Sequence, residues 1–309
     1  MKKNKTYNMF MLLLLSFVML TTTLQAQQES QFTQYMYNTV SINPAYAGNR
    51  GSLSLLGLYR NQWVGLDGAP ETMNFTAHSP IGVRGVGLGI GFTSDKIGPS
   101  SESIVSADFS YTINFSEKIQ LSFGIKGGIS LMDINPNKLL IYNPNDYNLE
   151  FNSSSSPIIG LGFFLHSEDW YLGVSSPNLL ETEYYDDIQV STASEKSHLY
   201  FTGGYIFTMS PIIKFKPALM VKAVTGAPLA IDVSANMLFY DQLTLGLAYR
   251  FDAAVSALAG FQINDNIMIG YAYDYDTTEL GNYNNGSHEI FLRFELGTRF
   301  KAKVNPRFF

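Results

Sequence analysis

The sequence is dominated by long runs in which apolar residues alternate with polar or small ones. From Ile119 to Leu131, every second residue is apolar apart from Gly127, and the residues between them are polar or glycine. The same period of two recurs over residues 229–239, 242–252, 267–276 and 290–296. Because successive side chains of a strand point to opposite faces, these runs predict β-strands with one apolar and one polar face.

The length of the runs and the composition favour a membrane barrel over a soluble sandwich. Several runs reach the roughly 9–11 residues that a tilted strand needs to cross a bilayer, whereas strands of soluble proteins average about 5–6 residues. Only 15% of the residues are charged, against about 25% in soluble domains. The mean hydropathy of +0.02 is nevertheless too low for a helical membrane protein. Aromatic residues, 14% of the chain, gather near the ends of the runs, as in the interfacial girdles of membrane barrels.

About 14 such runs are expected. The connections that follow odd-numbered runs differ in length from those that follow even-numbered runs. The runs span residues 52–60, 71–79, 84–94, 103–114, 118–131, 158–166, 169–176, 198–208, 212–222, 229–239, 242–252, 254–263, 267–276 and 288–298. Connections after odd-numbered runs are mostly long (61–70, 132–157, 176–197, 277–287), with 252–254 an exception. Those after even-numbered runs are short (116–117, 167–168, 240–241, 264–266). Long extracellular loops and short periplasmic turns are typical of outer-membrane barrels.

We therefore predict an all-β protein, an antiparallel transmembrane β-barrel of about 14 strands in the cell outer membrane. The first 26 residues have a basic start, an apolar stretch from Met9 to Leu20 and a polar end at Ala26, as in a secretory signal. An uncleaved anchor is disfavoured because the apolar stretch is shorter than the roughly 20 residues of a membrane span. The expected organisation is a signal peptide over 1–26, an N-terminal periplasmic or plug segment over 27–50, the barrel over 51–299 and a C-terminal tail over 300–309.

The sequence offers no convincing catalytic or metal-binding constellation. The absence of cysteine excludes disulfides, a thiol nucleophile and Cys-ligated metals, and the four histidines lack metal-ligand spacing. The Ser–His neighbours at 197–198 and 287–288 would point to opposite faces of a strand, so neither forms a nucleophile–base couple. A cross-strand pair stays open. The net charge of −6 gives no support to nucleic-acid binding. We expect no enzyme activity, catalytic residue, cofactor, metal or nucleic-acid partner.

Charged residues at inward positions predict a polar lumen with ion pairs across strands. The expected lumen charges are Asp108, Lys126, Asp232, Arg250, Asp274, Arg293 and Glu295. Paired catalytic carboxylates are the alternative interpretation, but a polar lumen needs such groups in any case. Glycines at 85, 87, 89 and 91 share one face of a run, which predicts a segment packed against that face or a sharp bend.

Several further motifs follow one another along the chain. They lie at residues 31–38 (QFTQYMYN), 43–48 (NPAYAG), 59–65 (YRNQWVG), 67–70 (DGAP), 95–99 (DKIGP), 176–180 (SPNLL), 222–229, 260–265 (GFQIND), 270–275 (GYAYDY), 286–290 (GSHEI) and 305–309 (NPRFF). In this order they resemble the PorP/SprF family of Bacteroidetes over essentially the whole mature chain. The loops at 133–157 and 181–197 match no pattern, so partner choice is expected to lie there.

The resemblance implies an outer-membrane barrel of the type IX secretion system and of gliding motility. Members of that family assist the export or surface attachment of a cell-surface protein, often an adhesin with a type B C-terminal sorting domain. One branch works instead with the periplasmic ring of the secretion machine. The implied partners are the secreted protein, type IX secretion components and outer-membrane lipid. The family has no known catalytic residues, so none is carried over.

We accordingly expect a scaffold whose outer loops hold the sorting domain of an exported protein. The candidate partner-contact residues are Trp63, Asp67, Pro70, Tyr184, Tyr185, Asp186 and Asp187. The alternative is an outer-membrane transport channel for a small or lipidic solute, because a barrel of this strand number has room for a lumen.

Overall fold

A computed structural model describes residues 31–82, 85–135, 138, 153–180, 182–183 and 194–296. Within these ranges the helices are short: α2 (Thr39–Ile42), η1 (Pro44–Tyr46) and η4 (Glu279–Asn282). No helix of the described ranges has the length and hydropathy that a membrane span requires. The expected signal peptide and C-terminal tail lie outside the described residues.

Seventeen strands account for most of the rest. They are β1 (Leu53–Asn61), β2 (Glu71–Ile81), β3 (Val86–Ile97), β4 (Ser100–Asn114), β5 (Gln120–Ile134), β6 (Ser154–His166), β7 (Trp170–Ser176), β8 (Thr182–Glu183), β9 (Ser194–Glu195), β10 (His198–Tyr205), β11 (Phe207–Ser210), β12 (Ile213–Val224), β13 (Ala230–Phe239), β14 (Leu243–Arg250), β15 (Ala254–Gln262), β16 (Ile267–Asp276) and β17 (Ser287–Leu296).

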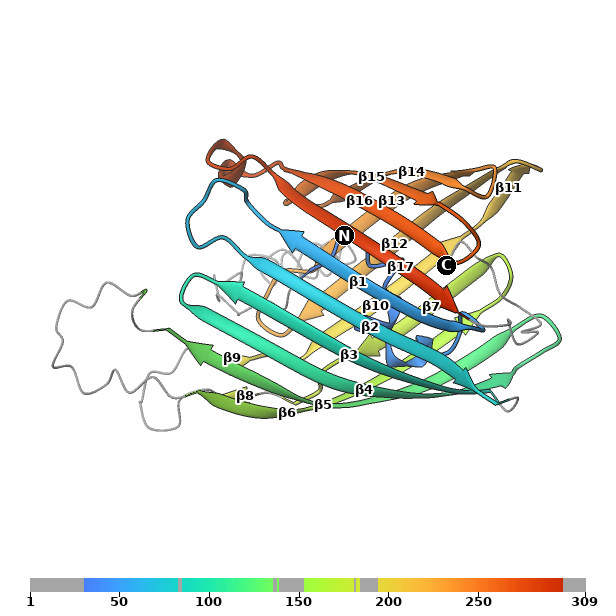
Figure 1. The fold of residues 1–309 in the computed structure, drawn as a ribbon, viewed down its shortest axis with the longest axis horizontal. Coiled ribbons are helices and arrows are strands. Elements are labelled where there is room, and N and C mark those ends of the chain that lie inside the picture. Colours follow the sequence, from blue (N-terminus) through green and yellow to red (C-terminus); the bar gives the residue numbers. More distant parts are fainter. Residues whose placement is uncertain are drawn as a thin grey trace, which may run out of the picture.

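All but β8 and β9 belong to one antiparallel sheet that closes on itself (Figure 1). Closure is made by β1, which pairs with β2 on one side and with β17 on the other. β10 and β11 are two parts of one strand interrupted at Ile206, and both pair with β12. Counted so, the barrel has 14 strands, which confirms the predicted fold class and strand number.

The predicted runs coincide with the strands, with one instructive difference. β3 continues to Ile97 and β4 begins at Ser100, so the connection expected over residues 95–102 is reduced to a two-residue turn. The polar residues between are paired across the two strands, as in Asp95 with Glu102. Gly98, with φ +56°, supplies the left-handed backbone of the tight turn.

Counted in chain order, connections that follow odd-numbered strands of the barrel lie at one end, and those that follow even-numbered strands lie at the other. Residues 62–70, 135–153, 177–197 and 277–286 connect strands at one end, which we call the outer end. The other end, called the inner end, has only short turns, such as residues 115–119, 167–169 and 240–242. In Figure 1 the outer end lies on the left and the inner end on the right. Since long loops of such barrels face the outside of the cell, the outer end is extracellular.

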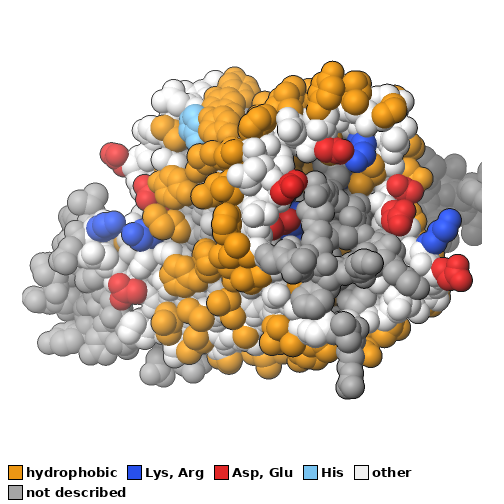
Figure 2. Space-filling model, turned by 45° about the vertical axis from the view of Figure 1, so that its right-hand side comes forward, with side chains coloured by type: hydrophobic (Ala, Val, Ile, Leu, Met, Phe, Trp, Pro, Cys, Tyr) orange, Lys and Arg blue, Asp and Glu red, His pale blue; other side chains and the backbone are white. Residues whose placement is uncertain are grey.

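The two faces of each strand differ in chemistry. Along β3, Leu88, Ile90 and Phe92 point outward and are exposed, and Leu245 and Leu247 of β14 do the same. Figure 2 shows such side chains as a broad hydrophobic surface over the barrel wall. The intervening side chains are mostly polar and buried inside. An apolar outer wall around a polar interior fits the hydrocarbon core of a bilayer.

Candidate functional site

Residues 31–52, which precede β1, lie inside the barrel; we call them the plug. Residues 32–40 and 42–47 are all buried. The aromatic side chains of the plug pack against lumen-facing apolar residues of the wall, with the rings of Tyr37 and Phe291 4.9 Å apart. The lumen is therefore filled by the chain's own N-terminal segment over these residues.

A buried group of charges holds the outer end of the plug. The Glu289 carboxylate accepts hydrogen bonds from the backbone N–H groups of Thr33 (3.0 Å) and Gln34 (2.8 Å). The Thr33 hydroxyl donates to Asp274 at 2.7 Å. Arg60 joins the two acids, at 2.7 Å from Asp274 and 3.0 Å from Glu289, and all three side chains are almost fully buried. We call Arg60, Asp274 and Glu289 the anchor.

Asn43 and a set of glycines fix the middle of the plug. The Asn43 side chain accepts a hydrogen bond from the backbone of Ala45 and donates one to the carbonyl of Phe163, both at 3.0 Å. Opposite this turn, the wall carries glycine where a Cβ would collide with the plug. Gly87 faces the Ala47 carbonyl, Gly124 faces Ala45, and Gly162 faces Asn43. For Gly87, this confirms that the glycine stripe accommodates a segment packed on its inner face.

Replacing Gly124 with valine is expected to destabilise the protein by about 1–3 kcal/mol, the usual cost of overpacking. The added side chain would overlap the backbone of Pro44 and Ala45. Gly127→Val is the matched control on the same strand, because no atom lies within 4 Å of the position that its Cβ would take. Urea unfolding in detergent micelles measures both. Equal losses in the two variants would show that packing against the plug is not the cause.

The structure places each expected lumen charge inside the barrel next to an opposite charge. Asp108 and Lys126 face each other across β4 and β5 at 3.6 Å, and Asp232 and Arg250 across β13 and β14 at 2.9 Å. Glu295 contacts Arg293 at 3.3 Å and also pairs with Arg50 of the plug. Asp274 belongs to the anchor. Several of these charges thus contact the plug as well as each other.

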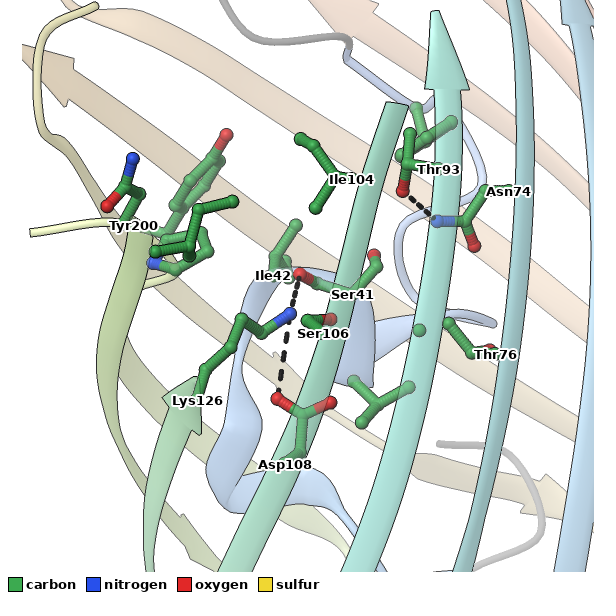
Figure 3. Close-up of a pocket in the computed structure, with 16 residues that line it drawn as sticks. Ser41, Ile42, Asn74, Thr76, Thr93, Ile104, Ser106, Asp108, Lys126 and Tyr200 are labelled. Atoms are coloured by element: carbon green, nitrogen blue, oxygen red, sulfur yellow. Dashed lines mark hydrogen bonds and ion pairs between the residues drawn. The ribbon is translucent and has the colours of Figure 1, made fainter. Parts of the chain in front are cut away.

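Two further contacts show this double role. Lys126 donates to the backbone carbonyl of Ser41 at 3.1 Å, and Gln31 donates to Asp232 at 2.7 Å. Figure 3 shows Lys126 reaching between Asp108 and Ser41, in a cavity of about 80 Å³ on the outer side of the plug. A second cavity of about 40 Å³ lies on the inner side, between Tyr37, Arg293 and Glu295.

Sequence reasoning missed two residues of the anchor. Arg60 continues the inward series of Leu56 and Leu58 on β1, and Glu289 precedes Phe291 and Arg293 on the inward face of β17. The alternation therefore carried a usable signal for both positions. The alternation did not identify the partners of these two residues. The contacts of Glu289 with the plug, for example, join residues more than 200 positions apart in the chain.

Among the candidate partner-contact residues, Trp63 and Asp67 lie in the outer loop 62–70. This loop is held on both sides by backbone hydrogen bonds. Val64 N–H donates to Gly286 at 2.9 Å and Asn285 N–H donates to Val64 at 2.8 Å, while Gly98 N–H donates to Gly68 at 2.9 Å. The loop is thus a pre-shaped part of the outer surface.

The side chains of the loop differ in their access to a partner. Asp67 is exposed and Trp63 is half-buried, and the loop borders a recess of about 440 Å³ that Lys96 and Lys138 also line. Pro70 is buried, and its carbonyl accepts a hydrogen bond from Gln62 within the loop. Its side chain is thus less accessible than those of Asp67 and Trp63, and partner contact at Pro70 stays a prediction. Tyr184, Tyr185, Asp186 and Asp187 lie outside the described residues.

Two of the histidines have hydrogen-bond partners in the wall and in the plug. His288 lies beside the Tyr271 hydroxyl at 2.6 Å, and the Nδ1 of His78 accepts a hydrogen bond from Gly48 of the plug. Within the described ranges, no cluster of three or more His, Asp or Glu side chains is arranged to hold a metal ion. Several buried polar groups of the lumen, among them Glu289, His78 and Lys126, contact the plug.

Several solved structures share this fold. The chain is similar to the TodX deltaS2S3 mutant monoaromatic hydrocarbon channel, with a TM-score of 0.51 and 9% identity over 89% of this chain and 96% of that one. The CymD monoaromatic hydrocarbon channel gives 0.50 and 10%, over 87% and 94%. The toluene transporter TbuX of Ralstonia pickettii gives 0.48 and 10%, over 84% and 92%. At such identities the likeness concerns the fold alone. The comparison with curated proteins gave no match.

The family comparison reaches further than the fold. Residues 24–294, nearly the whole chain, match the family described as type IX secretion system membrane protein PorP/SprF. This confirms the resemblance inferred from the motifs and agrees with a closed barrel whose outer wall is apolar. The chain therefore belongs to the PorP/SprF family and is an outer-membrane β-barrel of the type IX secretion system.

Proposed function

We propose that this protein is a non-enzymatic scaffold that assists the export or surface anchoring of a secreted, adhesin-like protein with a type B C-terminal sorting domain. The observation that carries the proposal is the filled lumen. The cavities on the two sides of the plug, about 80 and 40 Å³, are far below the roughly 300–1,000 Å³ of ordinary ligand pockets. A barrel closed in this way acts through its ends and its loops.

The outer loop 62–70 is one described part of the outer surface. Its backbone is tied to residues 285–286 on one side and to Gly98 on the other, so little conformational entropy is lost when a partner binds. It presents an exposed carboxylate at Asp67 and a half-buried indole at Trp63. Tryptophan is among the residues that most often dominate binding energy at protein interfaces.

The test is co-purification from outer membranes of the native host, with an affinity tag on the C-terminus of the barrel. We expect recovery of a protein that carries a type B sorting domain, together with type IX secretion components. Recovery of neither would contradict the scaffold.

A pair of variants tests the role of the loop. The double variant Trp63→Ala with Asp67→Ala is expected to lose the exported protein and to keep the secretion components. Glu117→Ala changes an exposed residue of an inner turn and serves as the control, with recovery as in the wild type. Undiminished recovery of the exported protein by the double variant would move its binding site away from this loop.

A transport channel for a small or lipidic solute is the second candidate. The outer cavity favours it, because Phe32, Val40, Ile42, Ile158 and Tyr200 give it a partly apolar lining. Uptake or conductance in liposomes separates the two candidates, since a scaffold with a filled lumen passes no solute.

A further inference from the structure

The plug enters the lumen at the outer end of the barrel. Its first described residues contact strands close to their outer ends: Asp232 and Glu289 are the third residues of β13 and β17, and Asp274 is third from the end of β16. Arg60 is the last but one residue of β1, which runs toward the outer end. The hydrogen bonds of Gln31, Thr33 and Gln34 to these acids therefore lie at the extracellular side of the lumen.

The plug leaves the lumen at the inner end. Asn49 donates a hydrogen bond to Ser122, the third residue of β5, which starts at the inner end. Arg50 pairs with Glu295, the last but one residue of β17, which finishes there. β1 then begins at Leu53 and runs back outward. Over residues 31–50 the chain thus crosses the lumen from the outside toward the periplasm.

We propose that the mature N-terminus of this protein is presented at the extracellular mouth of the barrel and not in the periplasm. The expected cleavage after Ala26 leaves residues 27–30 before Gln31. A stretch of four residues spans at most about 14 Å. The distance from Asp274 to the outer end of β16 is two residues, which rise only about 7 Å. The chain is long enough to reach the mouth from its anchored position.

This direction changes what the outer surface consists of. The sequence left open whether segment 27–50 plugs the lumen or contacts periplasmic components, and the second alternative would place it on the inner side. With the opposite direction, the first described residue, Gln31, is held at the outer end of the lumen by Asp232 of β13. In one respect this inference rests on the proposed function: the N-terminus then lies on the side of the membrane on which the exported protein is held.

The absence of cysteine allows a direct test with single-cysteine variants of the full-length protein in its host. Ser30→Cys reports on the N-terminus, Thr278→Cys on an exposed outer loop and Glu117→Cys on an exposed inner turn. Intact cells are treated with a membrane-impermeant maleimide, and permeabilised cells give the full signal. Heat-modifiable migration of each variant in SDS gels verifies that its barrel is folded.

We expect S30C to be labelled on intact cells to the same extent as T278C, while E117C is labelled only after permeabilisation. The proposed direction is overturned if S30C, like E117C, is labelled only after permeabilisation. A photo-crosslinker attached to S30C then tests whether the exported protein is held near the N-terminus. Crosslinking to the exported protein from S30C supports this location, and crosslinking from E117C alone overturns it without affecting the labelling result.

Discussion

Arg60→Ala is expected to lower the free energy of unfolding by about 3–5 kcal/mol, the usual cost of removing one partner from a buried ion pair. Arg60 lies 2.7 Å from Asp274 and 3.0 Å from Glu289, and all three side chains are at most 2% exposed. Without the guanidinium, two acids would remain buried together with no counter-charge between them. Protonation or water entry would follow, and both weaken the hold on Thr33 and Gln34.

Urea unfolding in detergent micelles measures this loss, and limited proteolysis of the N-terminal segment locates it. Lys214→Ala is the matched control, because its ion pair with Asp241 has the same 2.7 Å distance but is 35% and 57% exposed. Exposed pairs contribute about 0–1 kcal/mol. Arg60→Lys keeps the charge and loses the bidentate fork, so an intermediate loss is expected. A loss for R60A no larger than that for K214A would contradict a structural role of the anchor.

The wall of this barrel could be predicted from the sequence because its signal is local. On strands such as β5 and β14, each residue's face follows from its neighbours two positions away, and the bilayer imposes a minimum strand length. The same logic placed Asp108 and Lys126 in the lumen, where the structure pairs them. It underestimated β3 and β4, since polar residues such as Asp95 and Glu102 extend the ladder past the apolar run.

The interior could not be predicted in the same way. Residues 31–50 have no period that indicates where they lie, and their contacts are with strands from the whole chain. The glycine stripe that includes Gly87 indicated something packed inside, but a glycine does not identify its neighbour, and Gly124 and Gly162 were not recognised as further such positions. The direction of the plug follows only when the register of β13, β16 and β17 is known.

Deletion of residues 31–47 is expected to convert a closed barrel into a conducting one. About eight strands give an interior that side chains alone can fill, so 14 strands need additional material to be closed. Here the plug supplies it, with buried residues along nearly its whole length. Planar bilayer recordings should show stepwise conductance for the deletion and none above background for the wild type. Deletion of residues 27–30 alone is the control and should leave the barrel closed.

The two outcomes against this expectation have different meanings. A wild-type barrel that conducts like the deletion variant would show that the plug moves aside, and would favour a transport channel over a scaffold. A deletion variant that is folded by circular dichroism and heat-modifiable migration but does not conduct would show that the plug is not the seal. Backbone and side-chain groups of the plug form hydrogen bonds with the buried charged side chains of Glu289, Asp274 and Lys126. These contacts hold the plug in the lumen, so they support a closed wild-type barrel.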